Sequence, residues 1–187
     1  MYEQLSFRAQ YDELTTLLNR ASLYDRMDAE MTACNHEAGA MAILYFDLDS
    51  FKEINDLYGH AAGDVVLRAV SRRILQNIRR GDTAARIGGD EFVILLPGVL
   101  DRRDASRVAE LVGQAVSERI EFDGRELHVG SSYGIAIYPD DGQHIDGLLK
   151  TADEDMYRAK LGRPEPWRRI GRKAPSAEPD RSPSPIR

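Results

Sequence analysis

The stretch of the chain best suited to chemistry is Gly88-Gly89-Asp90-Glu91, two glycines followed by two acidic residues. It lies between residues 83–87 and 92–96, two short segments typical of strands. Two glycines between strands predict a tight hairpin, because a primed turn needs positive φ, which glycine adopts without steric cost. Adjacent carboxylates repel each other unless a cation or a charged ligand compensates them. The stretch therefore predicts a ligand site, and the alternative is an ordinary solvated hairpin tip.

A further acidic residue, Asp47, follows the apolar run that begins at Met41. Near-continuous hydrophobicity predicts a central strand that is covered on both faces. An acid at the C-terminal end of such a strand is a ligand, a helix cap or a surface residue. Asp49 or Ser50 can cap the short helix expected next, so capping does not require Asp47.

Size and composition indicate one domain without a membrane span. The chain has 187 residues, of which 30 % are charged, and a single cysteine, Cys34. One cysteine excludes an intramolecular disulfide and fits a reducing compartment. No apolar run approaches the length of a membrane span, and the N-terminus lacks the order of a signal peptide. We therefore expect a cytoplasmic protein that makes no membrane contact.

Charge is unevenly distributed along the chain. The formal net charge is −6, yet residues 163–187 contain seven basic and three acidic residues, so the acidic excess lies before them. An acidic body argues against non-specific nucleic-acid binding. It suits divalent cations and, through them, the phosphates of a nucleotide.

The order of expected elements indicates an α+β fold. Asn19 is a candidate N-cap for a helix that runs to about Cys34. Apolar periodicity predicts helices over residues 60–79, 104–119 (with Leu111 facing inward) and 145–161, and strands over 126–129 and 132–138. Strands and helices that alternate around one hairpin predict a central mixed, mostly antiparallel sheet with helices packed on its faces.

Three segments are expected along the chain. Residues 1–11 resemble the end of a connecting helix, and residues 12–163 form the domain. Six of the eight prolines lie in 164–187, mixed with serine and arginine. That composition predicts a mostly disordered tail.

The residues assembled so far resemble the GGDEF family, the diguanylate cyclases, over roughly residues 12–163. Each matching motif is weak by itself, but together they occur in the family's order and spacing. They are Leu14-Thr15 with Asn19-Arg20, FDLDSFKEINDLYGHAAGD (46–64), RIGGDEF (86–92), SYGIAIYPDDG (132–142) and ADEDMYRAK (152–160). The resemblance implies a core similar to that of nucleotidyl cyclases and polymerase palms. It also implies condensation of two GTP molecules into cyclic di-GMP and two pyrophosphates.

The resemblance further implies a metal site. Two Mg²⁺ ions per half-site, which Mn²⁺ can replace, would be held by Asp47, the main-chain carbonyl of Leu48, and Asp90. Asp90 would be the general base for the 3′-hydroxyl, and Glu91 would support the metal site or its lysines. Lys52 would stabilise the charge of the transition state, the alternative being a solvated helix lysine.

Other positions match the family's nucleotide contacts. Asn55 and Asp64 would select guanine, because a carboxylate accepts from both N1–H and the exocyclic amine, a donor pair that adenine lacks. His60 would line the site, the alternative being surface or core packing. Backbone at Gly88 and Gly89 would let ribose and phosphates come close. Lys160 would hold the terminal phosphates.

A second constellation, Arg79 and Asp82, stands at the family's fixed offset before the glycines. By resemblance it is an inhibitory site where product binds, Arg79 to guanine or phosphate and Asp82 to guanine. It predicts allosteric product inhibition.

The resemblance also implies partners and leaves alternatives. Each protomer would bind one GTP, so catalysis would need a homodimer, and an upstream sensor domain would control its assembly. After Lys160 the chain departs from the family pattern, since Arg163 comes one residue early and proline follows it. One alternative is a weak or inactive GGDEF domain that acts as a cyclic di-GMP receptor. A cyclase of relaxed base choice is another, which Asp64 disfavours.

Overall fold

A four-stranded antiparallel sheet forms the centre of the domain. The computed structural model describes residues 10–37, 39–99 and 101–161. The strands lie in the order β2-β3-β1-β6, with bounds Thr83–Arg86, Glu91–Pro97, Met41–Asp49 and Gly130–Tyr138. Every pairing of these strands is antiparallel. The expected α+β fold is confirmed, and the parallel component is limited to one isolated bridge, between Leu18 and Ala85.

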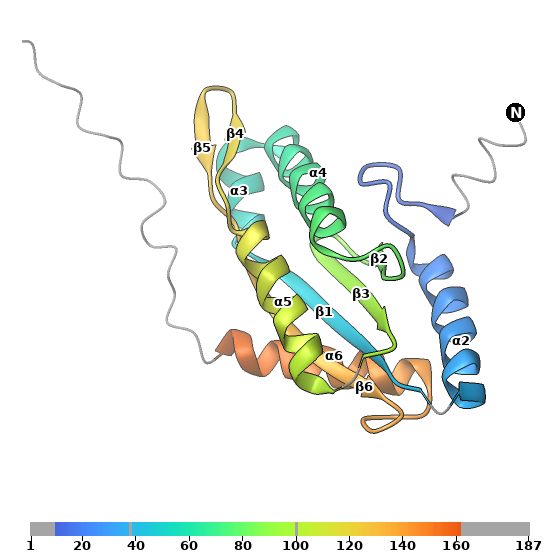
Figure 1. Ribbon diagram of the computed structural model, residues 1–187. Coiled ribbons are helices and arrows are strands. Elements are labelled where there is room, and N and C mark those ends of the chain that lie inside the picture. Colours follow the sequence, from blue (N-terminus) through green and yellow to red (C-terminus); the bar gives the residue numbers. More distant parts are fainter. Residues whose placement is uncertain (1–9, 38, 100, 162–187) are drawn as a thin grey trace, which may run out of the picture.

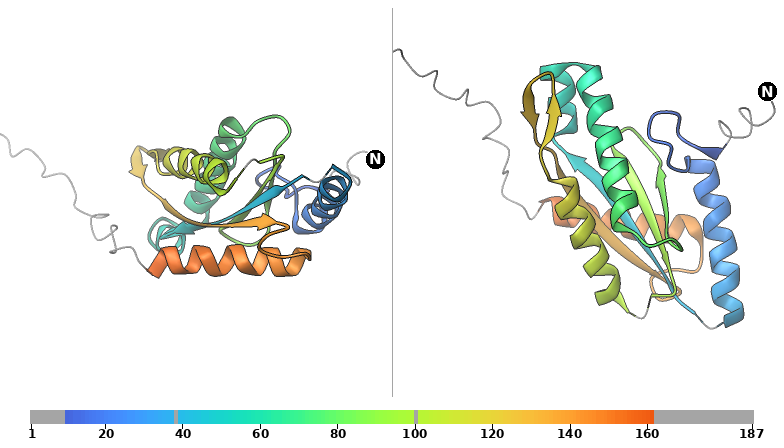
Figure 2. Two further views of the ribbon diagram at one scale, coloured as in Figure 1. Left: turned by 60° about the horizontal axis from the view of Figure 1, so that its bottom comes forward. Right: turned by 45° about the horizontal axis from the view of Figure 1, so that its top comes forward.

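Helices cover both faces of the sheet (Figures 1 and 2). α3, α4 and α5 pack on one face, whereas α2 and α6 pack on the other. The small hairpin β4–β5 extends beyond the sheet, past the C-terminal end of α5 and beside α4 (Figure 1). The bounds are α2 Arg20–Glu37, α3 Phe51–Tyr58, α4 His60–Asn77, α5 Arg102–Val116, β4 Ile120–Phe122, β5 Arg125–Leu127 and α6 Ile145–Leu161.

Alternation along β1 divides the core into two clusters. Ala42, Leu44 and Phe46 pack with α3, α4 and α5, whereas Ile43 and Tyr45 pack with α2 and α6. Successive strand side chains point to opposite faces, so the near-continuous apolar run reflects burial on both sides. By the same alternation, Asp47 lies on the α6 face.

Most local expectations hold, with several corrections. Asn19 caps α2, since its Oδ1 accepts from Ser22 N at 3.0 Å. The strand expected at 126–129 belongs instead to the separate hairpin β4–β5. Leu111, expected inside, is 50 % exposed, because α5 buries Ala105, Ala109, Val112 and Val116. Residues 1–9 of the connecting segment expected at 1–11, and the tail expected at 164–187, lie outside the described residues.

Candidate active site at the end of β1

The C-terminal end of β1 carries two acidic residues into the site. Asp47 lies opposite Glu91 of β3 and opposite Ser132 of β6. Asp49 accepts a hydrogen bond from Ser132 Oγ at 2.9 Å, so it is tied to β6. Ser50, not Asp49, is the N-cap residue of α3, and it makes no side-chain capping bond. The expectation of Ser50 as a cap is thus confirmed for its position, although its side chain makes no capping hydrogen bond.

The glycine turn joins β2 to β3 beside this strand end. Leu48 N donates to Asp90 O at 3.2 Å, and Ile87 N donates to Glu91 O at 3.0 Å. Neither Gly88 nor Gly89 has the left-handed φ expected of a primed turn. A Cβ at Gly88 would lie 2.3 Å from Glu91 Oε2, so the Glu91 side chain would have to move to accommodate one.

Glu91 is held by a tyrosine of the central strand. Tyr45 OH donates to Glu91 Oε1 at 3.0 Å. Burial, followed by the charge of Glu91 and this hydrogen bond, raises the pKa of Tyr45, so its hydroxyl remains a donor at neutral pH. The support of a metal site or its lysines by Glu91 remains a prediction.

Asp90 lies in an environment that disfavours its charge. Burial and then the charge of Asp47 raise the pKa of Asp90, while Lys160 partly offsets both. The carboxyl groups of Asp47 and Asp90, which are far apart in the sequence, therefore act on each other. A cation bound between these two carboxyl groups would offset their mutual repulsion and the cost of their burial.

Lys160 supplies a positive charge to this acidic group. Its Nζ, near the end of α6, donates to Oδ1 of Asp47. Burial alone would lower the pKa of Lys160, but the hydrogen bond to Asp47 and the charges of Asp47, Asp49 and Asp90 outweigh it and raise that pKa. The residue expected at terminal phosphates thus contacts an expected metal ligand.

The donor chemistry of the site fits a hard divalent cation. No three His, Cys, Asp or Glu residues within 10–37, 39–99 and 101–161 are grouped to hold a metal. The expected ligand set is smaller, with Asp47, Asp90 and the carbonyl of Leu48, so nucleotide phosphates would complete it. The Lys160 ammonium on Asp47 shows that the carboxylate already attracts a cation.

Asn55, one of the two residues expected to select guanine, lies where α3 meets α4. Asn55 Nδ2 donates to Phe51 O at 3.3 Å. A Cβ at Gly63 would lie 2.2 Å from Asn55 Oδ1, so Asn55 packs against the residue that precedes Asp64. His60 is exposed at the start of α4 and Lys52 is exposed in the first turn of α3. The roles of these side chains stay predictions.

Arg79 and Asp82 form an ion pair between α4 and β2. Arg79 Nε lies 2.9 Å from Asp82 Oδ1, and Arg79 N donates to Asp82 Oδ2 at 3.0 Å. The Asp82 side chain is 2 % exposed, whereas that of Arg79 is 62 % exposed and also donates to Pro97 O. Asp82, expected to accept from guanine, is thus engaged in orienting Arg79.

Sequence reasoning missed a link between the N-terminal segment and the glycine turn. Arg86 donates to the carbonyl oxygens of Gly88 and Gly89 and also pairs with Asp12. Both residues lie within or beside family motifs, since Arg86 begins RIGGDEF and Asp12 comes two residues before Leu14-Thr15. That position was the available signal.

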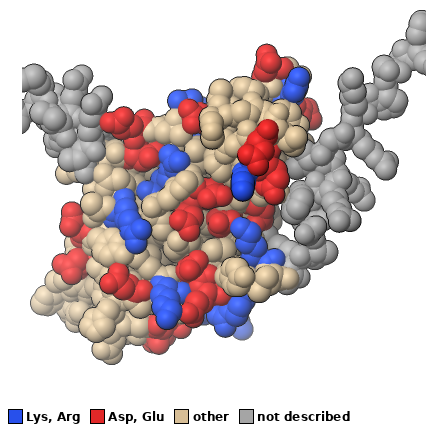
Figure 3. All heavy atoms as spheres, turned by 180° about the vertical axis from the view of Figure 1, so that it is seen from behind, with Lys and Arg blue, Asp and Glu red and all other residues tan. Residues whose placement is uncertain are grey.

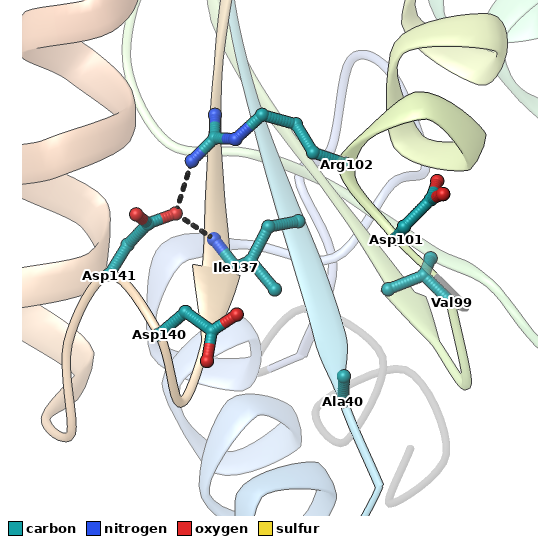
Figure 4. A pocket seen from close by; sticks show the side chains of 7 residues that line it. All are labelled: Ala40, Val99, Asp101, Arg102, Ile137, Asp140 and Asp141. Carbon is teal, nitrogen blue, oxygen red and sulfur yellow. Dashed lines mark hydrogen bonds and ion pairs between the residues drawn. The ribbon is translucent and has the colours of Figure 1, made fainter.

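A cavity of about 230 Å³ lies at the other end of β1. Figure 4 shows Asp141 between Arg102 and the main chain of Ile137, and Asp141 Oδ2 accepts from Ile137 N at 2.6 Å. None of the expected site residues lines this cavity. Its lining residues are Ala40, Val99, Asp101, Arg102, Ile137, Asp140 and Asp141.

On the face behind the view of Figure 1, acidic side chains gather around a few basic ones (Figure 3). This pattern agrees with the acidic charge of the body. None of the helices in the described part of the chain is long and apolar enough to cross a membrane.

Comparison with known proteins shows to which family the domain belongs. Residues 9–165 match the family described as diguanylate cyclase, GGDEF domain. Over 152 residues the chain is 41 % identical to MucR of Pseudomonas aeruginosa, a bifunctional diguanylate cyclase/cyclic di-GMP phosphodiesterase; the match covers 81 % of this chain and 22 % of MucR. Identity to the diguanylate cyclase TpbB of the same organism is 40 % over 157 residues, covering 83 % and 36 %. The chain therefore spans 22–36 % of the length of these two relatives.

Solved structures of GGDEF proteins have the same fold as this chain. The GGDEF domain of TpbB superimposes with a TM-score of 0.78 at 39 % identity, covering 81 % of this chain and 88 % of that one. A sensory box/GGDEF family protein from Caulobacter crescentus gives the same TM-score and identity, covering 81 % and 98 %.

The fold and site define a class, an α+β domain of the nucleotidyl-cyclase type with acidic residues at the end of its central strand. Within that class, this chain belongs to the GGDEF family.

Proposed function

We propose that the chain is the catalytic domain of a diguanylate cyclase, which condenses two GTP molecules into cyclic di-GMP and two pyrophosphates. One observation carries the proposal. Asp47 lies near the end of β1 and Asp90 in the turn before β3, where Leu48 N donates to Asp90 O at 3.2 Å and the charge of Asp47 raises the pKa of Asp90. Paired carboxylates at a turn without bulky side chains suit a metal-bound triphosphate.

Each protomer would bind one GTP, and two protomers would face each other. The 3′-oxygen of each nucleotide then bonds to the α-phosphorus of the other while the bond to pyrophosphate breaks. Asp90 accepts the hydroxyl proton, since burial and Asp47 already favour its protonated form. Two such steps close the ring, which makes the homodimer part of the mechanism.

Residues of this chain would bind and orient the nucleotide. Asp47, the Leu48 carbonyl and Asp90 would hold the Mg²⁺ ions, which when bound neutralise the α-phosphate and stabilise the leaving pyrophosphate. Lys52 would stabilise charge at the reacting phosphate. The guanine base would contact Asn55 and Asp64 beside His60, and an upstream sensor domain would set the dimer's effective concentration.

The test is incubation of concentrated protein with Mg²⁺ and either GTP or ATP, followed by chromatography of the products. We expect cyclic di-GMP from GTP alone, at a rate per protomer that rises with protein concentration. Asp90→Asn removes the base and one charge of the pair, so turnover should fall at least 10²-fold while the melting temperature stays equal or rises. A wild-type protein that binds cyclic di-GMP but makes none would establish the receptor alternative.

A further inference from the structure

Glu91 is the cross-strand neighbour of an expected metal ligand. Asp47 of β1 lies directly opposite Glu91 of β3 in their antiparallel pair. Side chains of directly opposed residues share one face of a sheet, with Cβ atoms about 4.5–5.5 Å apart. Two carboxylates in this position repel each other, and a hard cation between them would attract the oxygens of both. By its place on the backbone, Glu91 is therefore a candidate ligand beside Asp47.

The side chain of Glu91 is turned to other partners. Tyr45 OH donates to Glu91 Oε1 at 3.0 Å. The second oxygen, Oε2, lies against the glycine turn, since a Cβ built on Gly88 would be 2.3 Å from it. Contacts with Tyr45 and with the turn thus place both oxygens of the Glu91 carboxylate.

This orientation separates Glu91 from the expected ligands. The main chains of Asp47, Asp90 and Glu91 adjoin at the end of β1, where Leu48 N donates to Asp90 O. Even so, no three His, Cys, Asp or Glu side chains in residues 10–37, 39–99 and 101–161 are arranged to hold a metal ion. The three acids are therefore close along the backbone without forming a three-carboxylate site.

Tyr45 is a fixed point from which to hold a carboxylate. Its side chain alternates with those of β1 so that it lies on the same face as Asp47, and Glu91 is its diagonal neighbour across the strands. Tyr45 is only 8 % exposed and belongs to the core cluster between the sheet, α2 and α6. A buried ring has little freedom to move, and its hydroxyl needs a hydrogen-bond partner inside the protein. Phenylalanine would fill the same space without supplying the donor.

We propose that Tyr45 is a positioning residue that holds the Glu91 carboxylate beside Gly88 and so keeps it from joining Asp47 and Asp90 around a metal ion. With only two side-chain carboxylates engaged, coordination positions stay open for phosphate oxygens, whereas a third carboxylate would fill one of them. Residues that contact a ligand's neighbours, not the metal itself, commonly set metal affinity in this way. This inference deepens the proposed cyclase function and rests on it for the role of the phosphates.

The test compares Tyr45→Phe with the double variant Tyr45→Phe/Glu91→Gln and with the control Tyr138→Phe. Tyr138 is a matched control because it is 5 % exposed, belongs to the same core cluster and donates from its hydroxyl to Asn35. It pairs with Met41, at the opposite end of β1 from the site. Binding of Mn²⁺ alone is measured by electron paramagnetic resonance, together with kcat/KM for GTP and the melting temperature.

We expect Tyr45→Phe to bind Mn²⁺ about tenfold more tightly than wild type, because the released Glu91 carboxylate becomes a ligand. Its kcat/KM for GTP should fall about tenfold, because a coordination position is lost to phosphate. A purely structural role of Tyr45 would weaken Mn²⁺ binding instead. The double variant has no carboxylate to release, so the gain in Mn²⁺ affinity should disappear, and Tyr138→Phe should match wild type.

Unchanged or weaker Mn²⁺ binding in Tyr45→Phe would overturn the proposal, as would a gain that persists in the double variant or an equal kcat/KM in Tyr45→Phe. If wild type itself forms no cyclic di-GMP, the cyclase function fails. The Mn²⁺ titration needs no turnover, so it still decides whether Tyr45 holds Glu91 away from the metal.

Discussion

Lys160 near the C-terminal end of α6 donates a hydrogen bond from its Nζ to Oδ1 of Asp47 at the end of β1. The two residues are separated by 113 positions in the sequence. They meet because α6 crosses the face of the sheet toward which Asp47 points (Figure 2). Lys160 is also the residue expected to hold the terminal phosphates of a nucleotide, so two partners, Asp47 and phosphate, are expected for its ammonium group.

Lys160→Ala should separate these two roles. Loss of one charge-assisted hydrogen bond to phosphate predicts a rise of about tenfold in KM for GTP. The substitution also removes the Lys160 ammonium group, which competes with a metal ion for Asp47. We therefore expect Mn²⁺ to bind more tightly when no nucleotide is added, and electron paramagnetic resonance measures this binding. Lys150→Ala, which breaks the exposed Lys150–Glu154 pair on the same helix, is the control and should change neither quantity. Weaker Mn²⁺ binding in Lys160→Ala would contradict the competition.

Arg79→Ala should relieve product inhibition. The exposed guanidinium is oriented by the buried Asp82, so its removal leaves no fork for a guanine or a phosphate. We expect the cyclic di-GMP concentration for half-inhibition to rise at least tenfold while the initial rate stays the same. Arg80→Ala, at the exposed neighbouring position, should leave inhibition intact. An unchanged inhibition curve for Arg79→Ala would show that Arg79 does not bind the inhibiting product.

Gly134→Ala should destabilise the domain strongly. A Cβ at Gly134 would lie 2.1 Å from Ala152 O and 2.1 Å from Met156 N, both main-chain atoms of α6. The helix would have to move off β6, at a cost of about 2–4 kcal/mol in the free energy of unfolding. Gly147→Ala is the matched control on α6, where a Cβ meets no described atom within 4 Å. It should stabilise by up to about 1 kcal/mol, and urea denaturation measures both.

Asp12 should make stability depend on acid pH. Burial alone would raise the pKa of Asp12, but hydrogen bonds from Thr15 and the charge of Arg86 outweigh it and lower that pKa below its ordinary 3.8. Because folding lowers its pKa, the ionised Asp12 carboxylate stabilises the folded protein above pH 3.8. This stabilisation is lost as the pH falls through the pKa of Asp12 in the folded state. Asp12→Asn should therefore cost about 1 kcal/mol at pH 7, and the difference from wild type should shrink below about pH 4. A difference that grew on acidification would contradict this sign.

The sequence alone determined the local elements and the positions of the motifs. The apolar period after Ile145 predicted α6 with its observed bounds, and Asn19 marked the start of α2. Both depend on interactions within a few residues, which are written directly in the chain. The run from Met41 identified the central strand for the same reason, since burial on both faces leaves a continuous apolar pattern.

The tertiary structure decided which distant residues meet and why particular glycines are needed. Lys160 on Asp47, Tyr45 on Glu91, and Arg86 between Asp12 and the turn all join separate elements. No periodicity specifies such pairs, because they depend on how helices cross the sheet. Gly134 shows the same dependence, because main-chain atoms of α6 leave no room for a Cβ there, whereas Gly88 does not have the left-handed φ that its place in a hairpin predicted.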